Sequence, residues 1–233
     1  INYEVAIERE KLVRHDVMSA SGVTEDDFVL EIGPGIGTMT QYLCERAREV
    51  VAVEIDKNLI PILSDTLKNY SNVTVINEDI LKLDICKLAE EKNQGKPIKV
   101  VANLPYYITT PIVSKFVMET IPANEIVIMI QKEVAERLSA PVGTKEYGQI
   151  TVLLNYYFNI EKIIDVDRKA FYPTPNVDSA VIKMIRKDSL EDLTSFEHFD
   201  KLVKDSFQFK RKTIKNMSEK CLSPLLSDKE EQP

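Results

Sequence analysis

Residues that form disulfides or bind metals are scarce in this sequence. Its 233 residues include three cysteines, which lie far apart without any Cys-x-x-Cys pair, and two histidines. A disulfide scaffold needs more cysteines, and a structural zinc site needs closely spaced cysteine and histidine ligands. The sequence therefore predicts a reduced, cytoplasmic protein that holds no metal.

Long apolar runs are also missing. No stretch approaches the roughly 18 apolar residues that a membrane-spanning helix needs, and residues 1–10 do not resemble a signal peptide. Hydrophobic residues nevertheless make up 44% of the chain and charged residues 29%, so a sizeable core can form. We expect a soluble globular protein without a membrane partner.

An overall excess of positive charge is missing as well. The 30 basic and 37 acidic side chains give a net charge of −7, which argues against indiscriminate binding to nucleic acids. Residues 201–220 differ, because seven lysines and arginines stand there against two acidic residues, a local balance of +5. We predict that four of them contact phosphates, and we call these the basic quartet: Lys210, Arg211, Lys212 and Lys215. The alternative is a solvated helix face.

Short apolar runs alternate with helical patterns over the first two-thirds of the chain. The expected strands are 28–32, 50–55, 73–76, 99–102 and 126–130, and the expected helices are 38–48, 57–68, 85–92, 110–119 and 132–138. Valine, isoleucine and leucine fill both faces of these strands, which is typical of a mostly parallel sheet covered by helices. The pattern predicts a doubly wound, Rossmann-like α/β domain. The runs 150–158 and 180–185 predict two further strands.

A glycine-rich segment, Glu31-Ile-Gly-Pro-Gly-Ile-Gly37, follows the first expected strand and opens a helix. Its glycines allow a tight turn and a close approach to a ligand, and a helix N-terminus offers free N–H groups. A dinucleotide-binding fingerprint would have glycine in place of Thr38. The spacing Gly33-x-Gly35-x-Gly37 is instead typical of S-adenosylmethionine-binding loops. The alternative is a strand–helix turn that binds nothing.

Acidic residues follow the second and third expected strands. Glu54 ends the second strand, where an acid can accept hydrogen bonds from both hydroxyls of a ribose. Asp79 and Ile80 follow the third strand, where a carboxylate can accept from an adenine amino group while the next N–H donates to the ring. Taken alone, Glu54 would be a solvated charge and Asp79 a helix cap or turn residue.

The segment Asn103-Leu-Pro-Tyr106 follows the fourth expected strand, at the edge where α/β sheets bind ligands. Pro105 favours an extended Leu104, so that two carbonyl oxygens can face one planar exocyclic amine. Tyr106 offers a ring on which a base can stack. The alternative is a strand that ends at a proline beside a buried tyrosine.

These motifs, together with MIQKEVAERL, KEYGQI, FYPTPNVDSAV and SFQFKRKTIKNM, resemble the rRNA adenine N6-dimethyltransferases over residues 27–216. The family includes the bacterial KsgA (RsmA) branch and the Erm antibiotic-resistance enzymes. EIGPG, NLPYYITTP and PNVDSAV are more similar to KsgA. Two features depart from the family: its Gln-Asn-Phe-Leu segment, which would fall near residues 5–8, is absent, and its C-terminal helical domain is shortened. The first departure would affect cofactor affinity, and the second would affect RNA docking.

The resemblance implies an enzyme that uses S-adenosylmethionine to convert adenosines of 16S rRNA to N6,N6-dimethyladenosine during ribosome biogenesis. The partner would be the immature 30S subunit, and the enzyme would be a monomer. The implied catalytic residues are Asn103, Leu104, Tyr106 and Phe171. The implied cofactor-binding residues are Glu31, Gly33, Gly35, Glu54, Ile55, Asp79, Ile80 and Asn103.

Two domains follow from this interpretation. Residues 1–187 would form the S-adenosylmethionine-binding methyltransferase domain, and residues 188–233 a partial, helical and basic RNA-binding region. Two other functions stay open: an Erm-type methyltransferase that acts on 23S rRNA and confers macrolide resistance, and a non-catalytic rRNA-binding assembly factor.

Overall fold

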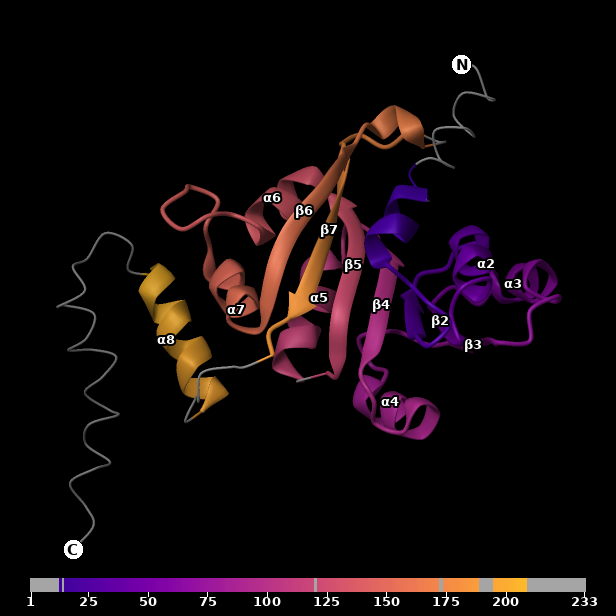
Figure 1. Ribbon diagram of the computed structural model, residues 1–233. Coiled ribbons are helices and arrows are strands. Elements are labelled where there is room, and N and C mark those ends of the chain that lie inside the picture. Colours follow the sequence, from indigo (N-terminus) through magenta and orange to yellow (C-terminus); the bar gives the residue numbers. More distant parts are fainter. Residues whose placement is uncertain (1–12, 14, 120, 172–173, 189–194, 209–233) are drawn as a thin grey trace, which may run out of the picture.

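A computed structural model describes residues 13, 15–119, 121–171, 174–188 and 195–208. These residues form a seven-stranded sheet with the order β3-β2-β1-β4-β5-β7-β6 (Figure 1). The strands are β1 Phe28–Ile32, β2 Glu49–Glu54, β3 Val73–Asn77, β4 Ile98–Asn103, β5 Ala123–Gln131, β6 Phe158–Val166 and β7 Ser179–Arg186. Neighbouring strands from β3 to β5 run parallel, and β7 is antiparallel to both β5 and β6. The prediction of a mostly parallel, doubly wound sheet is confirmed.

Helices cover both faces of this sheet (Figure 1). They are α2 Thr38–Cys44, α3 Ile60–Thr66, α4 Ile85–Asn93, α5 Thr109–Met118, α6 Lys132–Leu138, α7 Gln149–Tyr157, α8 Phe196–Gln208 and the 3-10 turn η1 Arg168–Ala170. Most of them are within a few residues of the predicted ranges, although α2 and α3 are shorter than the patterns 38–48 and 57–68 suggest.

Alternate strand residues divide the core into two apolar layers. Leu30 of β1 and Val100 of β4 belong to one layer, with apolar residues of α4, α5, α6, α7 and α8. Val29 and Val101, their neighbours in sequence, belong to the other layer, with residues of α2 and of the helical segment 15–21. Because successive side chains of a strand point to opposite faces, the all-apolar strands serve both layers.

The predicted strand over residues 150–158 is wrong, because this run forms α7 and β6 begins only at its last residue. Leu154 and Tyr157 are buried against the sheet. On another side of the helix, the ring of Tyr156 contacts that of Phe199 in α8, with centroids 5.3 Å apart. A helix covered on two sides is apolar nearly all round, and such a run cannot be told from a buried strand by its pattern alone.

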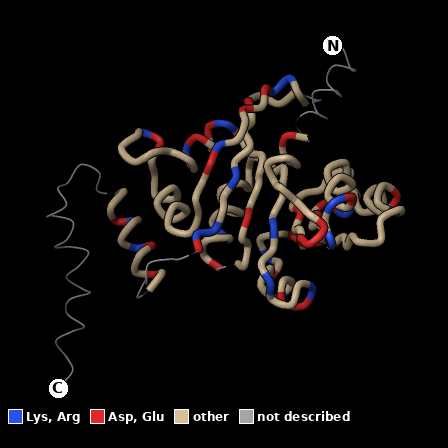
Figure 2. Tube along the Cα trace, in the orientation of Figure 1, with Lys and Arg blue, Asp and Glu red and all other residues tan. Residues whose placement is uncertain are grey.

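Helix α8 packs on α7, and acidic and basic residues are interspersed along it (Figure 2). Val203 is buried in the main apolar layer, the ring of Phe196 lies 6.1 Å from that of Tyr157, and Gln149 donates to Asp200 (3.2 Å). The described part of the 188–233 region therefore contacts the sheet domain directly. Its assignment as a separate domain stays a prediction.

Within the described ranges, no helix is both long and apolar enough to cross a membrane. The same residues contain no group of three or more histidine, cysteine, aspartate or glutamate side chains placed to hold a metal ion.

Candidate functional site

The carboxyl ends of adjacent parallel strands bring the predicted motifs to one edge of the sheet. Strand register pairs Ile32 of β1 with Val53 of β2 on one side and with Ala102 of β4 on the other. The residues that follow these three are Gly33, Glu54 and Asn103. Motifs some 70 residues apart in sequence therefore become neighbours at the position where open α/β sheets bind ligands.

The glycine loop has a backbone that other residues rarely adopt. Gly33 and Gly35 have φ angles of 70° and 60°, in the left-handed region. A Cβ atom on Gly33 would lie 3.9 Å from the carbonyl oxygen of Asn103, whereas one on Gly35 would meet no atom within 4 Å. The glycines are thus required by conformation, and the space beside Gly35 is open to a ligand.

Glu54 fixes this loop to the end of β2. Its Oε2 accepts a hydrogen bond from the Gly35 N–H (3.2 Å), and its Oε1 accepts one from the Asp56 N–H (2.9 Å). The side chain is 5% exposed, while the neighbouring Ile55 is 59% exposed. A carboxylate has about four lone-pair sites, so Glu54 can still accept further hydrogen bonds from a ligand.

Two cavities meet at the glycine loop, because Gly33 and Gly35 line both. The Glu54 cavity, of about 280 Å³, is lined by four predicted cofactor residues besides these two glycines: Glu54, Ile55, Asp79 and Ile80. Pro105, from the turn after β4, lines it as well. The Glu31 cavity, of about 220 Å³, is lined by Glu31, Asn103 and Phe171, together with Thr38 and Met39 at the start of α2. A ligand that extends past the glycine loop could occupy both.

Glu31 is a buried acid with no counter-charge. It is 0% exposed, and neither carboxylate oxygen forms a hydrogen bond with a described residue. Burial raises the pKa of its carboxyl to about 8; the Thr40 hydroxyl opposes this rise and the Glu54 carboxylate adds to it. An unpaired buried carboxyl is costly when charged. Glu31 therefore suits the cationic group of a ligand.

The Asn103–Tyr106 segment divides between the core and the cavity. Asn103 is exposed at the end of β4, and its side chain has no hydrogen-bond partner among the described residues. Leu104 is buried, with its N–H donating to the Met129 carbonyl (3.0 Å). The hydroxyls of Tyr106 and Ser179 share a hydrogen bond (2.9 Å), and Tyr106 lines neither cavity. The structure thus brings Asn103 and Phe171 into one cavity but leaves Tyr106 outside its lining.

Asp79 forms the turn-capping contact and also lies at the predicted cofactor site. Its Oδ1 accepts from the Leu81 N–H (2.9 Å), which is the turn-capping alternative, and it also lines the Glu54 cavity. Ile80 beside it is buried at the same cavity. Tyr107, which no motif in the sequence singles out, lines this cavity while 81% exposed. Its signal was a second tyrosine directly after the Asn-Leu-Pro-Tyr motif.

Some predicted residues fall outside the described part of the chain. These are the basic quartet and residues 5–8, where the Gln-Asn-Phe-Leu segment was expected and not found. Their roles stay predictions.

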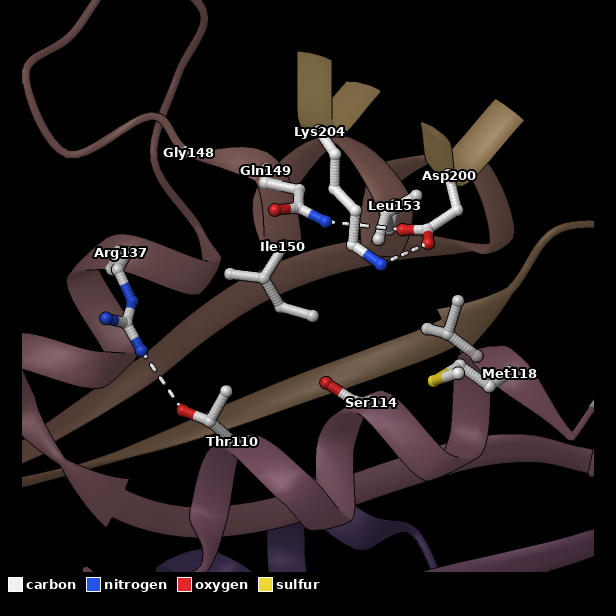
Figure 3. Close-up of a pocket in the computed structure, with 11 residues that line it drawn as sticks. Thr110, Ser114, Met118, Arg137, Gly148, Gln149, Ile150, Leu153, Asp200 and Lys204 are labelled. Atoms are coloured by element: carbon white, nitrogen blue, oxygen red, sulfur yellow. Dashed lines mark hydrogen bonds and ion pairs between the residues drawn. The ribbon is translucent and has the colours of Figure 1, made fainter. Parts of the chain in front are cut away.

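Another cavity, of about 390 Å³, lies between α5, α7 and α8 (Figure 3). Its charged side chains are paired with other groups that line it. Arg137 donates to the Thr110 hydroxyl (3.1 Å), and Asp200 pairs with Lys204 (2.6 Å). Because its charged groups already have partners within the protein, this cavity offers a weaker site for a charged cofactor than the strand-end cavities.

Comparisons with known proteins agree with this geometry. The family described as "Ribosomal RNA adenine dimethylase" matches residues 1–228. A protein of Lachnoclostridium phytofermentans named "Ribosomal RNA small subunit methyltransferase A" is 53% identical over 209 residues, which are 89% of this chain and 70% of that protein. Its namesake in Clostridioides difficile is 49% identical over 201 residues, 86% of this chain and 70% of that protein.

Two solved structures are similar as well. A dimethyladenosine transferase from Plasmodium falciparum has a TM-score of 0.77 and 31% identity, covering 88% of this chain and 72% of its own. The 23S rRNA methyltransferase ErmE has a TM-score of 0.75 and 27% identity, covering 90% of this chain and 82% of its own.

Proposed function

The chain belongs to the ribosomal RNA adenine dimethylase family, and we propose that it transfers methyl groups from S-adenosylmethionine to N6 of adenosines in small-subunit rRNA. The product is N6,N6-dimethyladenosine. The observation that carries the proposal is the free Asn103 amide, which lines one cavity with the unpaired Glu31 and the glycine loop. A hydrogen-bond acceptor for the target amine and a site for a cationic cofactor thus lie side by side.

The residues at the strand ends fit S-adenosylmethionine. The open space beside Gly35 and the unpaired, buried Glu31 carboxyl are both features that a bound cofactor would complete. In the proposed complex Glu54 accepts from the ribose hydroxyls, Asp79 and Ile80 hold the adenine edge, and Ile55 packs on its face. Glu31 faces the cationic amino-acid end. When bound, the cofactor supplies an electrophilic methyl group on a sulfonium sulfur.

The protein's own groups would position the target base. The Asn103 side-chain oxygen and the Leu104 carbonyl accept hydrogen bonds from the two N6 hydrogens, which directs the nitrogen lone pair toward the cofactor side. Phe171 stacks on the base from the wall of the same cavity. Tyr106 is assigned to the same base by the family resemblance alone, because its ring lines neither cavity and its hydroxyl shares a hydrogen bond with that of Ser179. The adenosine must first leave its RNA stack to enter.

Catalysis of this kind needs little acid–base help. A neutral exocyclic amine attacks with its lone pair, and its proton becomes acidic only as the new C–N bond forms. The contribution of the protein is then mainly the orientation of reactants, which can supply several kcal/mol of the barrier. This explains how a cavity lined by Asn103, with no histidine in its lining, could suffice.

We also propose the substrate particle, the cellular location, the oligomeric state and the domain roles. The substrate is 16S rRNA in the immature 30S subunit, in the cytoplasm, and the basic quartet contacts its phosphates. The enzyme acts as a monomer, with residues 1–187 as the methyltransferase domain and 188–233 as the RNA-binding region. Support comes from the small-subunit names of the relatives and from the basic stretch in the sequence.

One experiment separates this proposal from its rivals. The protein is incubated with labelled S-adenosylmethionine and either immature 30S particles or naked 23S rRNA, and the modified nucleotides are mapped. Dimethylated adenosines in 16S rRNA support the proposal. Label in 23S rRNA alone would indicate the Erm-type activity, which the similarity to ErmE keeps as the second candidate. Cofactor and RNA binding without label would indicate an assembly factor.

A further inference from the structure

Tyr107 is a large aromatic residue in an unusual position. It is 81% exposed, yet it lines the Glu54 cavity together with Ile55, which is 59% exposed. Both follow the carboxyl ends of strands, Ile55 after β2 and Tyr107 after β4. Exposed apolar side chains that gather at a cleft, rather than singly over the surface, are typical of ligand-binding sites.

The backbone holds Tyr107 firmly at this place. The Pro105 carbonyl accepts hydrogen bonds from the Ile108 N–H (3.2 Å) and from the Thr109 hydroxyl (3.2 Å). These bonds close the turn between β4 and α5, and Tyr107 lies within it. Its own ring and hydroxyl form no hydrogen bond or ring contact with a described residue. A ring on a fixed turn and without a protein partner is available to a ligand at little ordering cost.

We propose that the Tyr107 ring covers the adenine of the bound cofactor, on the side of the cavity away from Ile55. This inference rests on the proposed function, since it names a further residue for the same cofactor. Adenine is flat and has two apolar faces, which an aromatic ring and a branched aliphatic side chain can cover. Glu54 and Asp79, the hydrogen-bonding groups assigned to the adenosine half, line the same cavity.

The position also argues against a base of the RNA substrate as the partner of Tyr107. The groups assigned to the target adenosine, Asn103 and Phe171, line the Glu31 cavity, which Tyr107 does not line. Tyr106 and Tyr107, although adjacent in sequence, therefore have different tasks: Tyr106 bonds to Ser179 on β7, and Tyr107 stands at the cofactor side.

The sequence offers a direct optical test, because the chain contains no tryptophan. Tyr107→Trp would carry the single tryptophan of the protein, and stacking on adenine quenches indole fluorescence. We expect strong quenching by S-adenosylhomocysteine and by 5′-methylthioadenosine, which lacks the amino-acid end, and no change with methionine. The matched control is Tyr42→Trp, a 37% exposed position on α2 that lines neither cavity and should not respond.

Calorimetry on the full chain gives the second measurement. Tyr107→Ala should weaken binding of both adenosine compounds by the same factor, about five- to twentyfold, the lower part of the range for an aromatic that stacks on a base. Tyr107→Phe should bind nearly as wild type does.

Two outcomes would overturn the inference and leave the proposed function intact. The first is that the fluorescence of Tyr107→Trp is not quenched although calorimetry shows that the variant is saturated with the adenosine compound. The second is that Tyr107→Ala binds the cofactor as tightly as wild type but methylates RNA more slowly, which would place Tyr107 on the RNA side. Failure of wild type to bind any adenosine compound would overturn both.

Discussion

Replacing Glu31 with glutamine tests whether the cofactor cavity is maintained at the expense of stability. The two side chains have nearly the same shape, and protonated glutamic acid and glutamine are both neutral. At low pH the substitution therefore changes little, because each leaves similar polar atoms without partners in the same buried place. The comparison isolates the ionisation of one carboxyl.

The direction and size of the stability change in Glu31→Gln follow from the linkage between protonation and folding. Burial raises the pKa of Glu31 to about 8 in the folded protein, from 4.5. Between these values the unfolded chain has lost this proton while the folded protein keeps it. Wild-type stability consequently falls by about 1.4 kcal/mol for each pH unit across this window and levels off above pH 8. We expect Glu31→Gln to be more stable than wild type by on the order of 3 kcal/mol at pH 7, and by less than about 1 kcal/mol at pH 5.

The assay is urea denaturation of both proteins without cofactor at pH 5, 6, 7 and 8. Glu161→Gln removes an exposed carboxyl on β6 and serves as the control for the loss of one surface carboxylate. Other titrating groups contribute equally to wild type and variant, so they cancel. Parallel pH profiles for wild type and Glu31→Gln would refute the reasoning, since they would mean that Glu31 ionises at its ordinary pH despite its burial.

Cofactor binding should show the opposite trend at the same residue. A cation beside Glu31 favours the charged carboxylate, so binding releases a proton from it near neutral pH. Wild-type affinity for S-adenosylmethionine should therefore rise between pH 6 and pH 8, whereas that of Glu31→Gln should be lower and nearly independent of pH. Calorimetry in two buffers of different ionisation enthalpy counts the released protons.

Three further predictions concern the other parts of the site. Glu54→Ala should weaken S-adenosylmethionine binding by about 1.5–3 kcal/mol, the scale of hydrogen bonds to a charged acceptor; unchanged calorimetric affinity in a folded variant would remove Glu54 from the site. Replacing the basic quartet with glutamine should flatten the salt dependence of RNA binding by nearly one slope unit per lost phosphate contact, and a wild-type slope would indicate a solvated face. Asn103→Ala should slow single-turnover methylation by roughly 10²–10³ with cofactor affinity changed much less, while a near-normal rate would contradict the assignment of Asn103.

Local motifs carried most of what could be predicted about the site. Gly33, Glu54 and Asn103 each follow a strand whose apolar residues mark it clearly, and parallel strands place their ends at one edge whatever packs on the faces. Residues 150–158, by contrast, could not be assigned to a helix or a strand from their own pattern. Their conformation depends on burial against the sheet on one side and against Phe199 of α8 on another, and a run of apolar residues carries no record of which elements cover it.

The properties of individual side chains were harder to foresee, because they depend on neighbours that only the fold supplies. Glu31 is one residue among five buried ones in β1, and the absence of a partner for its carboxyl is set by what β2 and α2 place around it. If solvation alone decided this position, an apolar residue would be more stable there. An ionisable residue that lowers the stability of the folded protein at neutral pH, but whose carboxylate would match a cationic ligand, indicates a site shaped for binding. Asn103, by contrast, stands exposed at its strand end without cost. Replacing the two residues should therefore have different effects. Glu31→Gln should gain stability and lose cofactor affinity, whereas Asn103→Ala should lose methylation rate with stability and cofactor affinity changed much less.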